Sequence, residues 1–172
     1  YAIAPTVGTL YGQCKTGRIG EVVKNGIIAN IMMAAALVAV MAVFYACIGY
    51  MGQPRELLPY IRPYFLVLLA SLPFVCLFNV FTQFADGITD TAPSMWVTIS
   101  GNILNIFGNW VLIYGKLGAP EMGIVGAGTS TLISRIVMAA AMAGIFFTKR
   151  KYREYARGCR EGHVNRRDFT YL

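Results

Sequence analysis

Charged side chains are scarce in this sequence, and the acidic ones are the rarest. Only 13% of the 172 residues are charged, and 8 of them are Asp or Glu. None of these acids falls within the four long apolar runs that dominate the chain. Because helices of a water-soluble bundle need polar outer faces, so little charge argues against a soluble protein.

The residues that usually build metal sites and hydrolytic centres are also few. The one histidine, His163, lies in a basic segment where a solvated side chain is expected. The four cysteines are far apart and form no CxxC pair, which argues against a metal site and a disulfide framework. The glycines of residues 123–128 have the wrong spacing for a nucleotide-binding loop. We therefore expect no enzymatic activity, no metal site and no cofactor.

Apolar residues make up 56% of the chain and are gathered into long runs. A membrane-spanning helix needs about 20 mainly apolar residues to cross a hydrocarbon core of about 30 Å. Within residues 27–147 we predict four such helices, at 27–51, 64–84, 95–114 and 122–147. The predicted fold class is all-α, a polytopic transmembrane helix bundle.

The segments outside these spans complete the predicted organisation. Residues 1–14 read as the end of a transmembrane helix, residues 15–26 as a cytoplasmic loop, and residues 148–172 as a basic cytoplasmic linker. The chain opens on Tyr1, and we expect no signal peptide in it. We expect a fragment of a longer polytopic protein, called the parent protein below, whose remaining chain is its partner.

Lysine and arginine are concentrated in the segments 15–26 and 148–172, which hold most of the 15 basic residues. Such residues near membrane spans favour the cytoplasmic side. Four crossings place both segments on one side, so we predict cytoplasmic ends in the cell inner (cytoplasmic) membrane. The net charge of +7 is thus a topology signal, and no nucleic-acid partner is expected. Membrane lipids are expected neighbours, and residues 149–153 either contact anionic headgroups or form a solvated basic tail.

A row of amides interrupts the span 95–114. Asn102, Asn105 and Asn109 are three and four residues apart, which places them on one face of a helix. An unpartnered amide in hydrocarbon is costly, so this face should border the protein interior or a wet cavity. The row indicates a site for a polar or charged cargo, unless the amides only join neighbouring helices.

Two further features stand out. Arg135 lies about a dozen residues from either end of its span, where a charge needs water, a partner or a route to the membrane surface. Arg135 has either a structural role or a role in transport.

In the turn before residue 95, Asp90 or Thr91 is placed to cap the next helix, and Pro93 fits its first turn.

The order of small and polar residues from Gly87 to Arg135 is more specific than the apolar pattern. It reads G-x-x-D-T-x-P-x-M, then N-x-x-x-N in an apolar helix, then Y-G-x-x-G-A-P-x-x-G-x-x-G-A-G. This order resembles the multidrug and toxic compound extrusion (MATE) family, and most closely its NorM-type branch.

This resemblance implies part of a six-helix lobe, the first of two lobes in a twelve-helix antiporter. Such antiporters export organic, often cationic drugs and toxins, driven by inward flow of sodium ions or protons. The resemblance also implies that Asn105 and Asn109 belong to a polar network that couples transport to the ion. We assign Thr131 to the same network, and Asn102 extends its row of amides. Some members of that family carry an acid where Asn109 stands. This chain has an amide there, so a proton-binding carboxylate is absent at this position.

Two alternatives remain open from the sequence. The first is a lipid-linked oligosaccharide flippase of the same superfamily, which a cavity lined by several cationic side chains would favour. The second is a non-transporting four-helix membrane scaffold subunit, against which the row of amides argues.

Overall fold

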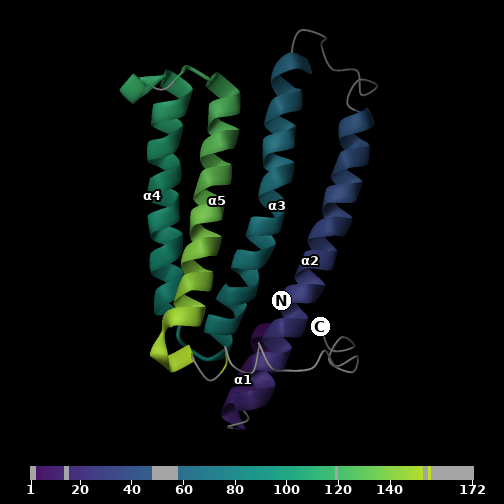
Figure 1. The fold of residues 1–172 in the computed structure, drawn as a ribbon, viewed down its shortest axis with the longest axis vertical. Coiled ribbons are helices and arrows are strands. Elements are labelled where there is room, and N and C mark those ends of the chain that lie inside the picture. The colour runs from purple at the N-terminus through teal and green to yellow at the C-terminus, as the bar shows by residue number, and fades with distance from the viewer. Residues whose placement is uncertain (1–2, 14–15, 48–57, 119, 153–154, 156–172) are drawn as a thin grey trace.

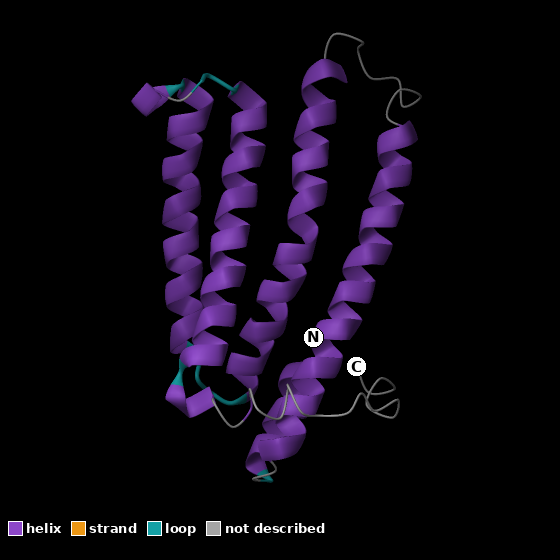
Figure 2. Ribbon diagram, viewed as in Figure 1, coloured by secondary structure: helices purple, strands orange, loops and turns teal. Residues whose placement is uncertain are grey.

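The computed structural model describes residues 3–13, 16–47, 58–118, 120–152 and 155. This part of the chain contains five α-helices, two short 3₁₀ turns and no strand (Figure 2). The helices are α1 (Ile3–Gly12), α2 (Thr16–Cys47), α3 (Leu58–Gly87), α4 (Ala92–Tyr114) and α5 (Gly123–Thr148), and the turns are η2 (Lys116–Gly118) and η3 (Arg150–Tyr152). Helices α2 to α5 are each long and apolar enough to cross a membrane, so the predicted all-α transmembrane bundle is confirmed.

Helix α2 begins earlier than the sequence indicated. Residues 16–26, which we predicted to be a loop, are helical. The reason is an apolar face that continues through this basic stretch, because Ile19, Val22 and Val23 are buried at helical spacing. Arg18 remains exposed beside them. Residues 48–51 of the predicted first span, and most of the predicted linker 148–172, lie outside the described residues.

The order of the helices in space differs from their order along the chain. Helix α5 lies between α3 and α4 and packs extensively on both (Figure 1). Helices α3 and α4 follow one another in sequence, yet they make few contacts. Helix α2 packs on the other side of α3, and the short α1 contacts both α2 and α3. The spatial order is therefore α2, α3, α5, α4.

The absence of side chains at several positions lets α4 and α5 approach closely. A Cβ atom at Gly101 or Gly108 of α4 would collide with a side chain of α5. On α5, a Cβ atom at Gly126 would lie 2.6 Å from the backbone oxygen of Leu112 on α4. Small residues at helix contacts are typical of membrane bundles, where packing replaces the hydrophobic effect as a driving force.

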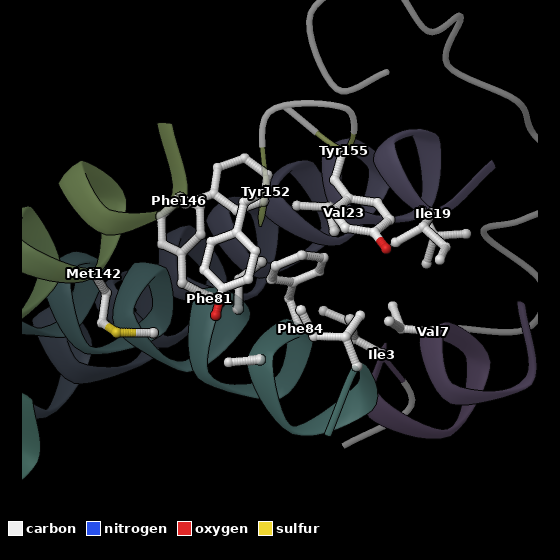
Figure 3. Close-up of a cluster of buried hydrophobic side chains, with 14 residues drawn as sticks. Ile3, Val7, Ile19, Val23, Phe81, Phe84, Met142, Phe146, Tyr152 and Tyr155 are labelled. Atoms are coloured by element: carbon white, nitrogen blue, oxygen red, sulfur yellow. The ribbon is translucent and has the colours of Figure 1, made fainter. Parts of the chain in front are cut away.

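The main buried apolar cluster lies at one end of the bundle, where α1, the start of α2 and the ends of α3 and α5 meet (Figure 3). Phe84 contacts the rings of Phe146, Tyr152 and Tyr155 at centroid distances of 5.0, 5.5 and 5.6 Å. Edge-to-face pairs of this kind contribute about 0.5–1.5 kcal/mol each beyond the burial of their area. The cluster thus joins α1, α2, α3 and α5 at this end of the bundle.

Away from this cluster, large apolar side chains point outward. Trp96 is 63% exposed and Ile106 is 69% exposed, both on α4. Exposed aromatic residues lie near both ends of that helix, Trp96 at the start and Trp110 and Tyr114 at the finish. This is the arrangement expected where a helix crosses a bilayer and its aromatic rings lie at the two interfaces.

The turn between α3 and α4 departs from its predicted capping. Thr91 occupies the N-cap position of α4, but its side chain makes no capping hydrogen bond. The carboxylate of Asp90 accepts hydrogen bonds from Lys149 and Tyr152 instead. The bond from the Lys149 ammonium is charge-assisted, and the phenol of Tyr152 is buried. Pro93 lies in the first turn of α4, as predicted.

Candidate functional site

A chain of hydrogen bonds crosses the contact between α4 and α5. The amide nitrogen of Asn109 donates to Oδ1 of Asn105 at 3.2 Å. The amide nitrogen of Asn105 in turn donates to Oγ1 of Thr131 at 3.3 Å. The hydroxyl of Thr131 donates a hydrogen bond to the backbone oxygen of Ala127, 2.9 Å away. The structure therefore brings together three of the predicted site residues, and we call these three side chains the amide relay.

All hydrogen bonds of the amide relay run in the same direction, which leaves an acceptor open at its head. Oδ1 of Asn109 is buried and has no hydrogen-bond partner among the described residues. A buried acceptor without a partner costs about 1–3 kcal/mol. A cation or a donor that contacted this oxygen would remove that cost. Oxygen atoms of this kind are also the ligands that hard cations prefer.

Backbone contacts fix the position of the relay. Ser130 on α5 donates to the backbone oxygen of Asn105 at 3.0 Å, and Gly108 gives it room to do so. Asn105 and Asn109 are one turn apart on α4, so both amides face α5 together. The glycine thus permits a close approach, and the close approach puts Asn105 within reach of Thr131.

A cavity of about 400 Å³ lies beside the relay, between α3, α4 and α5. Its polar lining residues are Asn79, Asn102, Asn105, Thr131, Ser134 and Arg135. Asn102 is exposed and makes no hydrogen bond with the described part of the chain. Asn102, Asn105 and Thr131 therefore share one cavity, whereas Asn109 reaches it only through Asn105.

Arg135 also lines this cavity, one turn beyond Thr131 on α5. Its Nη1 donates to Oγ of Ser71 on α3 at 2.5 Å. The described residues contain no ion pair for this guanidinium. The hydroxyl of Ser71 donates to the backbone oxygen of Leu68 at 2.6 Å, so its oxygen is oriented to accept the hydrogen bond from Arg135.

Sequence reasoning missed Asn79 and Ser71. Asn79 interrupts an apolar span in the same way as the amides of α4, so the same argument would have found it. Ser71 could not be found in this way, because a serine is common in membrane helices and its partner lies 64 residues further along. Thr129 lies near Thr131 in sequence but donates to the backbone of its own helix and takes no part in the relay.

The chemistry of the site follows from its atoms. It offers amide and hydroxyl oxygens, amide N–H groups and one guanidinium. The described residues hold no group of three or more His, Cys, Asp or Glu that could bind a metal. A site of this composition is suited to reversible binding of ions and polar molecules.

The four apolar spans of the described residues, with a partly polar cavity lined by three of them, define a multi-pass membrane protein. A sequence model of the MatE family matches residues 1–111, and the chain belongs to this family. Over 137 residues the chain is 32% identical to the probable multidrug resistance protein NorM of Photorhabdus laumondii. Over the same number of residues it is 31% identical to the multidrug resistance protein NorM of Vibrio cholerae. Each match covers 80% of this chain and 30% of the relative.

A third relative, the probable multidrug resistance protein NorM of Mannheimia succiniciproducens, is 34% identical over 148 residues. That match covers 86% of this chain and 31% of the relative. The chain thus spans about a third of the length of the curated relatives that it matches.

Proposed function

We propose that the chain forms most of the first lobe of a cation-coupled multidrug exporter in the cytoplasmic (inner) membrane. The parent protein would expel organic, often cationic compounds in exchange for sodium ions or protons. Membership of the MatE family and the names of the relatives support transport of drugs. The polar cavity between apolar spans supports a polar or charged cargo.

The observation that carries the coupling role is the open acceptor of the amide relay. Asn109 presents a buried oxygen without a partner among the described residues, and Asn105 and Thr131 place two more oxygens behind it. These ligands are neutral, so they would bind a cation weakly on their own. We propose that a carboxylate from the rest of the parent protein completes the site. Binding and release of the ion would then change the contact between α4 and α5.

The cavity supports a role in holding cargo. Its volume of about 400 Å³ falls within the range of about 300–1,000 Å³ that is usual for small-molecule sites. Its walls combine apolar side chains with a few polar groups, as such sites do. Asn79 and Asn102 are both exposed, so their amides are accessible to a molecule in the cavity.

The rival functions have less support. The relatives are named as multidrug resistance proteins, which does not favour an oligosaccharide flippase. Arg135 is also the single cationic residue among those that line the cavity. A scaffold subunit would not need the row of amides or a cavity lined by so many polar side chains.

The test uses the parent protein in proteoliposomes, with efflux of a cationic dye driven by a sodium or a proton gradient. Asn105→Ala and Asn109→Ala should each lower ion-driven efflux at least about fivefold, which is roughly 1 kcal/mol of coupling. The thermal unfolding midpoint should change little. Asn30→Ala is the matched control, because this amide lies in the apolar span of α2 and donates to the backbone of its own helix.

A purely structural role for these amides predicts the reverse pattern. Contacts of this kind between membrane helices average about 0.6 kcal/mol, so both variants would lose a little stability and keep their transport per folded molecule. That result would refute the coupling role.

A further inference from the structure

Most of the hydrogen-bond donors of the Arg135 side chain have no partner in the described part of the chain. A guanidinium carries five N–H donors. In the described part of the chain, one of them is directed to Ser71 and no carboxylate pairs with the group. Arg135 also borders the cavity that contains Asn79 and Asn102. Both of these amides are exposed and make no hydrogen bond with the described residues.

The depth of Arg135 restricts what can pair with it. It lies about a dozen residues from each end of α5, and a helix rises about 1.5 Å per residue, so either end of this membrane-spanning helix is roughly 18 Å away. An arginine side chain is too short to cover that distance, and a lipid headgroup does not reach the midplane. An isolated charge at this depth is costly and is found where it faces a cavity or a partner. Any anion must therefore arrive through the cavity.

We propose that Arg135, together with the amides of Asn79 and Asn102, forms a binding site for a carboxylate. A carboxylate is planar and accepts two parallel hydrogen bonds from a guanidinium. The bond to Ser71 holds one nitrogen of the group and leaves its other donors for the anion. Neither Asp nor Glu lines the cavity, so no resident acid among the described residues competes for the site.

The site rests on the proposed transport function and narrows its substrate class. The carboxylate has two possible sources, a zwitterionic cargo that carries both an organic cation and an acid, or an Asp or Glu from the rest of the parent protein. In the first case Arg135 selects among cargoes. In the second it holds the lobe to a neighbouring helix.

The experiment compares two dyes in the parent protein, a xanthylium dye with a free benzoate and the methyl ester of the same dye. If the cargo supplies the carboxylate, Arg135→Gln should lower efflux of the free acid at least tenfold and leave efflux of the ester within twofold. Arg135→Lys should keep part of the activity, since it retains the charge but loses the planar fork. Arg62→Gln is the control, because this arginine is exposed near the start of α3 and away from the cavity.

If the parent protein supplies the carboxylate, Arg135→Gln should lower the efflux of both dyes equally and lower the thermal unfolding midpoint. Neutralising the paired acid should then restore that midpoint. The site is refuted if Arg135→Gln leaves the efflux of both dyes and the thermal unfolding midpoint unchanged. It is also refuted if the midpoint falls and neutralising no acid restores it. Binding of the free-acid dye to the purified protein, measured by fluorescence anisotropy, separates this question from transport. A wild-type protein that exports neither dye would refute the proposed function. Binding of the free-acid dye, compared between the wild type and Arg135→Gln, would still decide whether Arg135 holds a carboxylate.

Discussion

The phenol of Tyr152 donates a hydrogen bond of 2.6 Å to the carboxylate of Asp90, although 62 residues separate them. The same carboxylate accepts from Lys149 at 3.1 Å. The ring of Tyr152 is buried against Phe84, and the Lys149 ammonium lies 5.0 Å from its centroid. These contacts join the turn between α3 and α4 to the segment that follows α5.

The first prediction concerns pH. Burial, and next the hydrogen bond and charge of Asp90, raise the pKa of Tyr152 above its ordinary value near 10. The fold thus favours the neutral phenol, so its contribution to stability is complete below about pH 10 and is lost as the pH rises through the folded-state pKa. Thermal unfolding of the purified parent protein should weaken more steeply with pH above about 10 in the wild type than in Tyr152→Phe. Parallel curves for the two proteins would contradict this.

The second prediction concerns Asn109→Asp. The change is nearly isosteric and places a titratable carboxyl group in the half-buried amide relay. Ion-driven efflux should become more dependent on pH than in the wild type, because the ligand charge at the site now changes with protonation. The measurement is efflux in proteoliposomes at several values of pH under a constant sodium gradient. Asn30→Asp on α2 serves as the control, and an equal change in both variants would argue against a special role for Asn109.

A third prediction tests the packing that builds the relay. In Gly108→Ala the new methyl group would collide with Oγ of Ser130 and lie 3.2 Å from its Cβ, so Ser130 must rotate or α4 and α5 must move apart slightly. We expect a loss of about 1–3 kcal/mol in stability, together with a loss of ion-driven efflux. Gly144→Ala is the matched control on α5, where the same methyl group meets nothing within 4 Å. A Gly108→Ala protein as stable and active as the control would show that the helices do not need this close approach.

The fourth prediction is topological. The start of α2 and the end of α5 lie at the same end of the bundle, so Arg18 and Arg150 share a side, while Glu121 lies at the other end (Figure 1). The distribution of basic residues predicts that the side of Arg18 and Arg150 is cytoplasmic. In a cysteine-free parent protein, an impermeant thiol reagent outside the cell should label Glu121→Cys and miss Arg150→Cys. The opposite labelling pattern would reverse the orientation.

The sequence predicted the helices well because each long apolar run imposes its own secondary structure. It also predicted that Asn105 and Asn109 share a face, since helical spacing alone decides that. It missed the start of α2, where basic residues hid the apolar positions Ile19 and Val23. The partners of distant residues were beyond its reach, because no local pattern records which helices become neighbours. The pairs Arg135 with Ser71 and Tyr152 with Asp90 are of that kind.

The position of α5 between α3 and α4 has a consequence for how the protein is made. Helices α3 and α4 are neighbours in sequence but make few contacts with each other. Helix α4 therefore has no partner for Asn105 until α5 has been synthesised, and it has the lowest hydropathy of the four spans. We expect α4 to enter the bilayer late, together with α5. During that interval the nascent chain would depend on the insertion machinery to shelter its amides from lipid.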